Sequence, residues 1–356
     1  MNRASAFRSL VALRAKGGEF AALDVVPDGF PVQPLLCLDY DPNVSTTNLL
    51  DRVTDVTRRL AAMDRLVMLD ATGLSAAPQL VGGAAGILGD LADRLSFPPD
   101  LFESPATFIP VVRLDATDDQ LARIGRLADE MGTGYAVRLR PADLGTEPLS
   151  GLLRRLPGFL DRLPGDLDVV DLILDLVYLP AVDQRLVETT ATILDAVRRW
   201  GSFRSTTLLS GSVPKTLNQT DLWEQPRYEE LLWRAVVDAG MDDVLLGDYG
   251  VTHPVFESGG WPSKHISVKY TCADHWLYLR ERIREPDEEN SRTRTVRLVS
   301  RHLVASGSFA GPDYSWGDRQ FAEAANGAGS ALGATTKPVA FATSHHLAYH
   351  ATRAAA

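Results

Sequence analysis

The amino-acid sequence predicts an α/β fold, a (β/α)8 TIM-like barrel followed by a C-terminal mixed extension. Eight short apolar or β-branched runs alternate with longer amphipathic stretches. This alternation is typical of strand–helix units arranged around a parallel sheet. The eight units lie within about 250 residues, which is the usual length of a closed barrel.

Each predicted element has its own local signal. The eight strands are predicted at Leu10–Arg14, Pro34–Leu38, Arg65–Asp70, Phe108–Leu114, Tyr135–Arg140, Val169–Leu176, Thr206–Ser210 and Val244–Asp248. Helices are predicted at Thr47–Met63, Ala84–Leu95, Asp118–Met131, Leu149–Leu163, Val182–Trp200 and Arg227–Ala239, with a short one at Gly18–Val26. The alternative is an open doubly wound sheet. That fold normally has a Gly-rich turn after its first strand, and Arg14–Glu19 (RAKGGE) lacks this fingerprint.

The alternation stops at Glu257, so we expect a barrel over residues 1–256 and an extension over residues 257–356. The extension has a strand-like run at His265–Cys272 and helical patterns at Thr295–Ala305, Gln320–Asn326 and Ser344–Arg353. We expect it to pack across the functional face of the barrel.

Composition excludes several classes of protein. With 45% hydrophobic and 23% charged residues the chain is globular rather than disordered. The net charge of −10 argues against non-specific nucleic-acid binding, which requires a cationic surface. No apolar run is long enough to span a membrane, and the N-terminus lacks the apolar region of a signal peptide. Two isolated cysteines form no disulfide framework, so the sequence predicts a cytoplasmic protein.

Charged residues at the ends of the predicted strands form the candidate site, because the loops that follow barrel strands carry the active face. Asp171 and Asp175 are four residues apart and share one face of their strand, while Arg138 and Arg140 share a face of the preceding one. The other strand-end candidates are Lys16, Glu19, Asp39, Asp70, Arg113, Asp115, Ser210, Ser212, Asp248 and Tyr249. A structural ion-pair network inside the barrel mouth would give the same pattern.

Helix capping is a simpler interpretation for some of these residues. Aspartates after strands often cap helices, and capping is the favoured interpretation for Asp39, Asp115 and Asp143. Function is favoured for Asp171, Asp175 and Asp248, because none of them immediately precedes a predicted helix.

The sequence contains no self-sufficient catalytic motif. A Walker lysine motif, GxSxG, HExxH and CxxC are absent. His346 and His350 are one helical turn apart and His345 adjoins them, which is a start for a metal site. Their spacing specifies no third ligand.

Several segments resemble the Beta-protein family of phages, satellite prophages and bacteria. They are KGGEFAAL (16–23), PLLCLD (34–39), VVDLILDL (169–176), GSVPKTLN (211–218), RYEELLW (227–233), LLGDYGVTHP (245–254), YTCADHWLYLRER (270–282), SWGDRQFAEAANG (315–327) and SHHL (344–347). The segment before SHHL departs from the family pattern, with KPVAF in place of an aromatic-rich approach. The resemblance implies site residues at Glu19, Asp171, Asp175, Gly247, Asp248, Tyr249, His253, Tyr270, Arg280, Asp318, His345 and His346.

The resemblance also implies a context, a mobile-element or antiphage-defence cassette in which the protein restrains a toxic partner. We therefore expect a component of such a module that binds a partner protein of the same gene cassette, or a small phosphorylated ligand, at the barrel mouth. An acidic surface suits a basic partner. The residues expected to bind the ligand are Lys16, Arg113, Arg138, Arg140, His253, Tyr270, Arg280 and Asp318.

A metal-dependent phosphodiesterase or nuclease is the alternative. Its catalytic residues would be Glu19, Asp171, Asp175, Asp248, Tyr249, His345 and His346, and its divalent metal would bind Asp70, Asp175 and Asp248. For a functional pocket we expect His345 and His346 to lie near Asp248 and Tyr249. We also expect Asp248 to face partly hydrated space, so that Asp248→Asn leaves the melting temperature nearly unchanged.

Overall fold

Eight parallel strands close into a barrel, which confirms the predicted TIM-like fold. The computed structural model describes residues 7–97, 105–141, 148–257, 263–284, 289–329 and 332–355. The barrel strands are β1 (Ser9–Arg14), β2 (Val32–Cys37), β3 (Met68–Asp70), β4 (Ile109–Arg113), β5 (Tyr135–Leu139), β6 (Val170–Tyr178), β7 (Ser205–Gly211) and β9 (Val244–Asp248). The sheet has no open edge, because β1 pairs in parallel with both β2 and β9.

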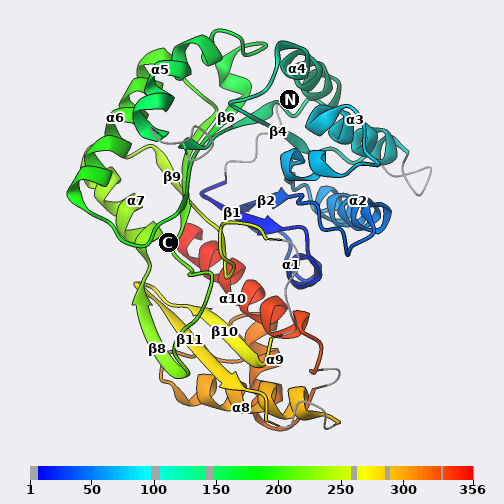
Figure 1. Cartoon of the computed structure of the whole chain (residues 1–356), viewed down its shortest axis with the longest axis vertical. Coiled ribbons are helices and arrows are strands. Elements are labelled where there is room, and N and C mark those ends of the chain that lie inside the picture. The colour runs from blue at the N-terminus through cyan, green and yellow to red at the C-terminus, as the bar shows by residue number, and fades with distance from the viewer. Residues whose placement is uncertain are drawn as a thin grey trace.

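Helices surround the barrel where the sequence patterns predicted them (Figure 1). They are α1 (Gly17–Leu23), α2 (Thr46–Ala62), α3 (Gly83–Ser96), α4 (Asp118–Met131), α5 (Pro148–Leu160), α6 (Gln184–Trp200) and α7 (Tyr228–Asp238). The capping interpretation of two aspartates is wrong: Ser45 caps α2 and Thr117 caps α4, each through its hydroxyl. Asp39 instead forms an ion pair with Arg14. Asp143 lies outside the described residues.

The remaining strands form a small antiparallel sheet in the order β10 (His265–Thr271), β11 (His275–Arg282), β8 (Asp221–Pro226). The sequence patterns predicted β10 but neither β8 nor β11. Strand β8 lies between β7 and α7 in the chain, so the small sheet takes one strand from the segment assigned to the barrel. The division of the chain at residue 256 stays a prediction.

Three helices complete the extension: α8 (Ser291–Ala305), α9 (Trp316–Ala325) and α10 (Thr336–Ala355). Figure 1 shows α10 between the barrel and the small sheet, with α8 and α9 on the far side of that sheet. A close approach of backbones fixes α10 against α1. A Cβ atom on Gly18 would lie 3.1 Å from the Thr336 carbonyl oxygen and 2.9 Å from Val339. Only glycine fits this contact without movement.

The apolar side chains divide into separate cores. One core lies inside the barrel and includes Leu10, Met68, Ile173 and Leu209. A second lies between the barrel strands and their helices. The extension has its own core, in which Phe321 and Phe341 are fully buried. Within the described part of the chain, no helix combines the length and apolar character that crossing a membrane requires.

Candidate functional site

A buried arginine occupies the centre of the barrel mouth. Arg138 donates to Asp175 at 2.9 Å, to Asp70 at 2.7 Å and to the hydroxyl of Tyr249 at 2.6 Å. That hydroxyl in turn donates to Asp175 at 2.7 Å. Arg138 is 2% exposed, so these charges have been withdrawn from water together. They are stable there only because each is paired and hydrogen-bonded.

Two further arginines complete this mouth network. Arg113 donates to Asp70 at 2.9 Å, and Arg140 lies 3.5 Å from Asp175. Burial alone would raise the pKa of Asp70, but the charges of Arg113 and Arg138 lower it below its ordinary value. Burial raises the pKa of Tyr249 well above its ordinary value, against the opposing charge of Arg138. Asp70 is therefore ionised, and Tyr249 is a neutral donor.

A backbone irregularity helps to position Asp175. The register between β6 and β7 shifts between Asp175 and Val177, and Val177 has a φ of 62°. A β-branched residue with positive φ is strained. The amide of Val177 donates to the Asp175 carboxylate at 2.9 Å, which compensates part of this cost.

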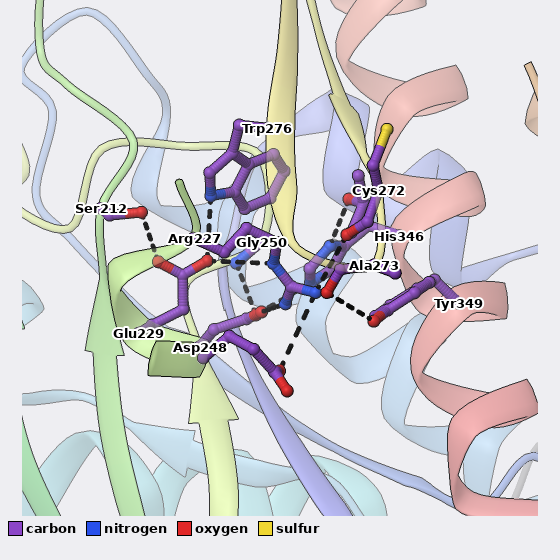
Figure 2. A network of polar contacts seen from close by, with 12 residues as sticks. Ser212, Arg227, Glu229, Asp248, Gly250, Cys272, Ala273, Trp276, His346 and Tyr349 are labelled. Atoms are coloured by element: carbon purple, nitrogen blue, oxygen red, sulfur yellow. Dashed lines mark hydrogen bonds and ion pairs between the residues drawn. The ribbon is translucent and has the colours of Figure 1, made fainter. Parts of the chain in front are cut away.

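A second network joins the end of β9 to α10 (Figure 2). The Asp248 carboxylate accepts hydrogen bonds from His346 Nε2 at 2.8 Å, His350 Nε2 at 3.0 Å, Arg227 at 3.2 Å and the amide of Gly250 at 3.0 Å. Burial alone would raise the pKa of Asp248, but the two histidines lower it well below its ordinary value. Burial lowers the pKa of His346 to about 4, against the attraction of Asp248.

Arg227 connects this second network to the small sheet. It donates to Glu229 at 3.2 Å and to the carbonyl of Cys272 at 3.3 Å, and its guanidinium lies 5.5 Å from the centre of the Trp276 ring. Trp276 also donates to Glu229, at 2.9 Å. These contacts tie α7, β11 and the barrel together around one buried cation.

The histidines fulfil the geometric expectation only in part. His346 reaches Asp248 as predicted. His345 instead lies 2.9 Å from Asp318 and 2.9 Å from the carbonyl oxygen of Thr271, and it stacks on Tyr270. Asp318 accepts a further bond from Tyr270 at 2.7 Å. His345, Tyr270 and Asp318 thus form a polar cluster inside the extension.

Asp248, His346 and His350 supply the third ligand that the histidine spacing left unspecified. Their candidate donor atoms lie within 4.8 Å of one another, the only such group among the described residues. Two imidazoles and a carboxylate suit Zn²⁺ or Fe²⁺. However, Arg227 contacts the same carboxylate oxygen as His350, so a cation placed there would face a guanidinium. Since the carboxylate is already fully hydrogen-bonded, the donor set does not fit a metal well.

The expectation that Asp248 faces partly hydrated space is wrong, because its side chain is 1% exposed. More generally, the candidate aspartates are bound by arginines: at the mouth Arg14 binds Asp39, Arg138 binds Asp70 and Asp175, and Arg227 binds Asp248, while toward the opposite end of the barrel Arg204 binds Asp171. The barrel mouth is thus largely a structural ion-pair network, the alternative that the sequence pattern had left open.

The candidate site that a ligand can enter lies beside this network. A cavity of about 320 Å³, named here the mouth cavity, lies where the ends of β1 and β9 meet the start of α10. Its lining includes Arg14, Lys16, Gly18, Glu19, Lys215, Thr252, His253, Val255, Phe256, Glu257, Thr335, Thr336 and Val339. Three of these residues are permanent cations, and Lys16 lies 4.7 Å from the centre of the Phe256 ring.

The cations of the mouth cavity differ in how they are held. Arg14 is fixed by its ion pair with Asp39 and by the carbonyl of Pro254 at 2.7 Å. Lys215 forms an exposed ion pair with Glu257. Lys16 lies against the Phe256 ring and forms no direct ion pair among the described residues, which leaves its ammonium group able to bind an anion.

The predicted site residues therefore fall into separate groups. The mouth network brings together Asp70, Arg113, Arg138, Arg140, Asp175 and Tyr249, and the mouth cavity brings together Lys16, Glu19 and His253. Asp171 lies toward the opposite end of the barrel, where Arg204 and Ser205 bind it. Arg280 lies on β11, where it contacts His265 and the carbonyl of Gln219. Neither residue joins the mouth.

Some residues of these sites were missed by sequence reasoning. The sequence pattern indicates Arg227 only as the start of a helix, and it does not distinguish Lys215 or Phe256 from other loop residues. The spacing of His350 pairs it with His346 but does not predict its contact with Asp248. The signal that could have found Lys215 is its position inside GSVPKTLN, one of the segments that carry the family resemblance.

A family model described as Beta protein matches residues 11–352. The chain belongs to the Beta protein family. The match to Beta protein spans the barrel and nearly all of the extension, including all residues of the mouth cavity. No curated protein matches the chain. Three segments of the predicted resemblance, KGGEFAAL, GSVPKTLN and LLGDYGVTHP, meet at the mouth cavity.

Proposed function

We propose that this Beta protein acts by binding a small phosphorylated ligand in the mouth cavity. The observation that carries the proposal is the cavity itself, in which Arg14, Lys16 and Lys215 converge beside the aromatic ring of Phe256. A volume of about 320 Å³ is at the lower end of the range for small-molecule sites. Lysine and arginine bind phosphate through charge-assisted hydrogen bonds.

The location supports the same conclusion. The lining residues follow β1 and β9 and precede or begin α10, so the cavity opens at the end of the barrel where ligands of this architecture bind. Residues of helix α10 and of the segment Thr252–Glu257 both line the cavity. A bound ligand would therefore contact both the barrel and the extension.

We further propose that the bound state is recognised by a partner protein in an antiphage-defence or toxin-restraining module. The family resemblance motivates this part of the proposal. The net charge of −10 favours a basic partner, because complementary charge accelerates and orients association.

The hydrolase alternative requires carboxylates that can bind a divalent metal. Asp70, Asp175 and Asp248 are instead each bound by an arginine. A metal at any of them would have to displace that arginine and leave a buried cation without its partner. The geometry therefore favours ligand binding over metal-assisted hydrolysis.

Isothermal titration calorimetry with inorganic phosphate and with sulfate tests the proposed site. Lys16→Met should weaken binding roughly ten- to a hundredfold, because a hydrogen bond to a charged group is worth roughly 1.5–3 kcal/mol. Lys215→Met should weaken it less, since that side chain is exposed and shared with Glu257. Lys264→Met, an exposed lysine outside the cavity lining, is the matched control. Equal affinity in all three variants and the parent would exclude the mouth cavity as the site.

A further inference from the structure

A buried acid forms part of the wall of the mouth cavity. Glu19 lies in the first turn of α1, and the residue is only 3% exposed. Unlike the strand-end aspartates, it has no arginine, hydroxyl or imidazole donor within hydrogen-bonding distance among the described residues, and its carboxylate accepts a hydrogen bond from its own backbone amide instead. A buried carboxylate that lacks such donors strongly favours its neutral form.

The charged groups around Glu19 come from several elements. Lys16 and Arg14 belong to the segment between β1 and α1, and Lys269 reaches toward it from β10. Lys215, His253 and Glu257 face the same cavity from the other walls, while the α10 residues of the lining carry no charge. Burial lowers the pKa of Lys269 to about 8, although the charge of Glu19 opposes this.

An anionic ligand in this cavity meets a chemical conflict. An ionised Glu19 would repel a phosphate dianion. Because both groups can only accept hydrogen bonds, neither could donate one to the other. A protonated Glu19 has the opposite character. It is neutral, and its hydroxyl can donate a hydrogen bond to a ligand oxygen.

We propose that the mouth cavity takes up its dianionic ligand together with one proton, which Glu19 carries and donates in a hydrogen bond to a ligand oxygen. The proton comes from solvent, and no covalent bond of the ligand forms or breaks. This inference rests on the proposed function, because it concerns the same cavity and the same class of ligand.

The acid is already poised for this role before a ligand arrives. Burial raises the pKa of Glu19 to about 7, against the hydrogen bond from its own backbone amide and the attraction of Lys16, Arg14 and Lys269. About half of the molecules therefore hold the proton near neutral pH, and about a tenth of them hold it at pH 8. A ligand that binds only the protonated form should bind about tenfold more weakly at pH 8 than at pH 6.

Sulfate is the probe of choice, because it stays a dianion throughout this pH range whereas phosphate titrates within it. Calorimetry at pH 6, 7 and 8 should show about tenfold loss of affinity across the range in the parent protein. At pH 8, titrations in two buffers with different ionisation enthalpies should reveal uptake of nearly one proton per bound sulfate.

Glu19→Gln is the decisive variant, because glutamine is a neutral isostere of the protonated acid and keeps a donor. It should bind sulfate at pH 8 as tightly as the parent does at pH 6, and it should take up no proton. A residual pH dependence in this variant belongs to Lys269, whose pKa burial lowers to about 8, and the Glu19→Gln/Lys269→Met double variant should remove it. Circular dichroism and melting curves confirm that each variant is folded.

The outcomes separate this inference from the proposed function. If neither the parent nor Glu19→Gln binds sulfate, the proposed anion site is wrong and this inference falls with it. If the parent and Glu19→Gln bind sulfate with the same affinity and the same pH dependence, the site stands and the proton-coupled role of Glu19 is refuted.

Discussion

Replacing Asp248 with asparagine should destabilise the protein severely. The carboxylate accepts four hydrogen bonds, from His346, His350, Arg227 and the amide of Gly250. An asparagine side chain has one acceptor oxygen, and its NH2 group would face donors on the opposite side. Arg227 would also lose a buried counter-charge. Removal of one partner from a buried pair costs roughly 3–5 kcal/mol.

This cost converts to a large change in melting temperature. For large domains 1 kcal/mol lowers the melting temperature by roughly 2 °C, so we expect a loss of about 6–10 °C. Differential scanning calorimetry is the assay, and Asp274→Asn is the control, since that carboxylate side chain is 81% exposed. Melting of Asp248→Asn within about 2 °C of the parent would refute the structural role of the network and restore the earlier expectation of a hydrated pocket.

A double variant separates the cost of losing the Arg227–Asp248 ion pair from other effects of the Asp248→Asn substitution. If the cost comes from leaving Arg227 unpaired, Arg227→Gln combined with Asp248→Asn should cost less than the two single changes added together. The difference expected for contacting residues is about 0.5–3 kcal/mol. Strict additivity would mean that the two residues act independently.

Four further outcomes can be measured directly. Glu257→Gln should tighten sulfate binding in calorimetry about twofold, because it releases Lys215 from an exposed ion pair worth at most about 1 kcal/mol. Between pH 6.5 and pH 4 His346 should bind a proton in the unfolded chain but not in the folded one, so the free energy of unfolding measured in urea should fall as the pH drops. His346→Gln should make this pH dependence weaker. As the pH rises from 4.5 to 7, Glu19 ionises in the unfolded chain before it ionises in the folded protein, so the parent protein should lose stability. Relative to the parent, Glu19→Gln should therefore gain up to about 3 kcal/mol in the free energy of unfolding measured in urea. Zn²⁺ or EDTA should leave the melting temperature unchanged, whereas a rise with Zn²⁺ that Asp248→Asn abolishes would establish a metal site.

The barrel could be predicted because its strands carry a strong local signal. The sequence of a parallel strand that is buried on both faces is a nearly continuous run of apolar residues, as in VVDLILDL and VLLGD. Strand β8 (DLWEQP) has no such signal, since its residues are half-buried or exposed and it ends in a proline. Its strand conformation depends on pairing with β11, which lies about fifty residues later in the chain. Only the tertiary structure supplies that information.

The candidate site, like the fold, could be predicted from the sequence only in part. The position of charged residues at strand ends correctly indicated a network of arginines and acids at the barrel mouth. The residues that decide its nature were not identified, because Arg227 contacts Asp248 from the start of α7 and His346 contacts it from a helix almost one hundred residues away. The mouth cavity depends on the same long-range packing, since Lys215 and Phe256 lie in loops without periodic pattern.

The distribution of charge explains why ligand binding belongs beside the barrel mouth and not inside it. Each strand-end aspartate of the mouth is bound by an arginine, so these acids already have partners and their ion pairs stabilise the fold. In the mouth cavity the balance is different. Lys16 contacts the face of Phe256, and Glu19 holds its proton in about half of the molecules near neutral pH, because burial raises its pKa to about 7. A dianion that enters therefore meets an excess of positive charge, and it does so without breaking any ion pair on which the barrel depends.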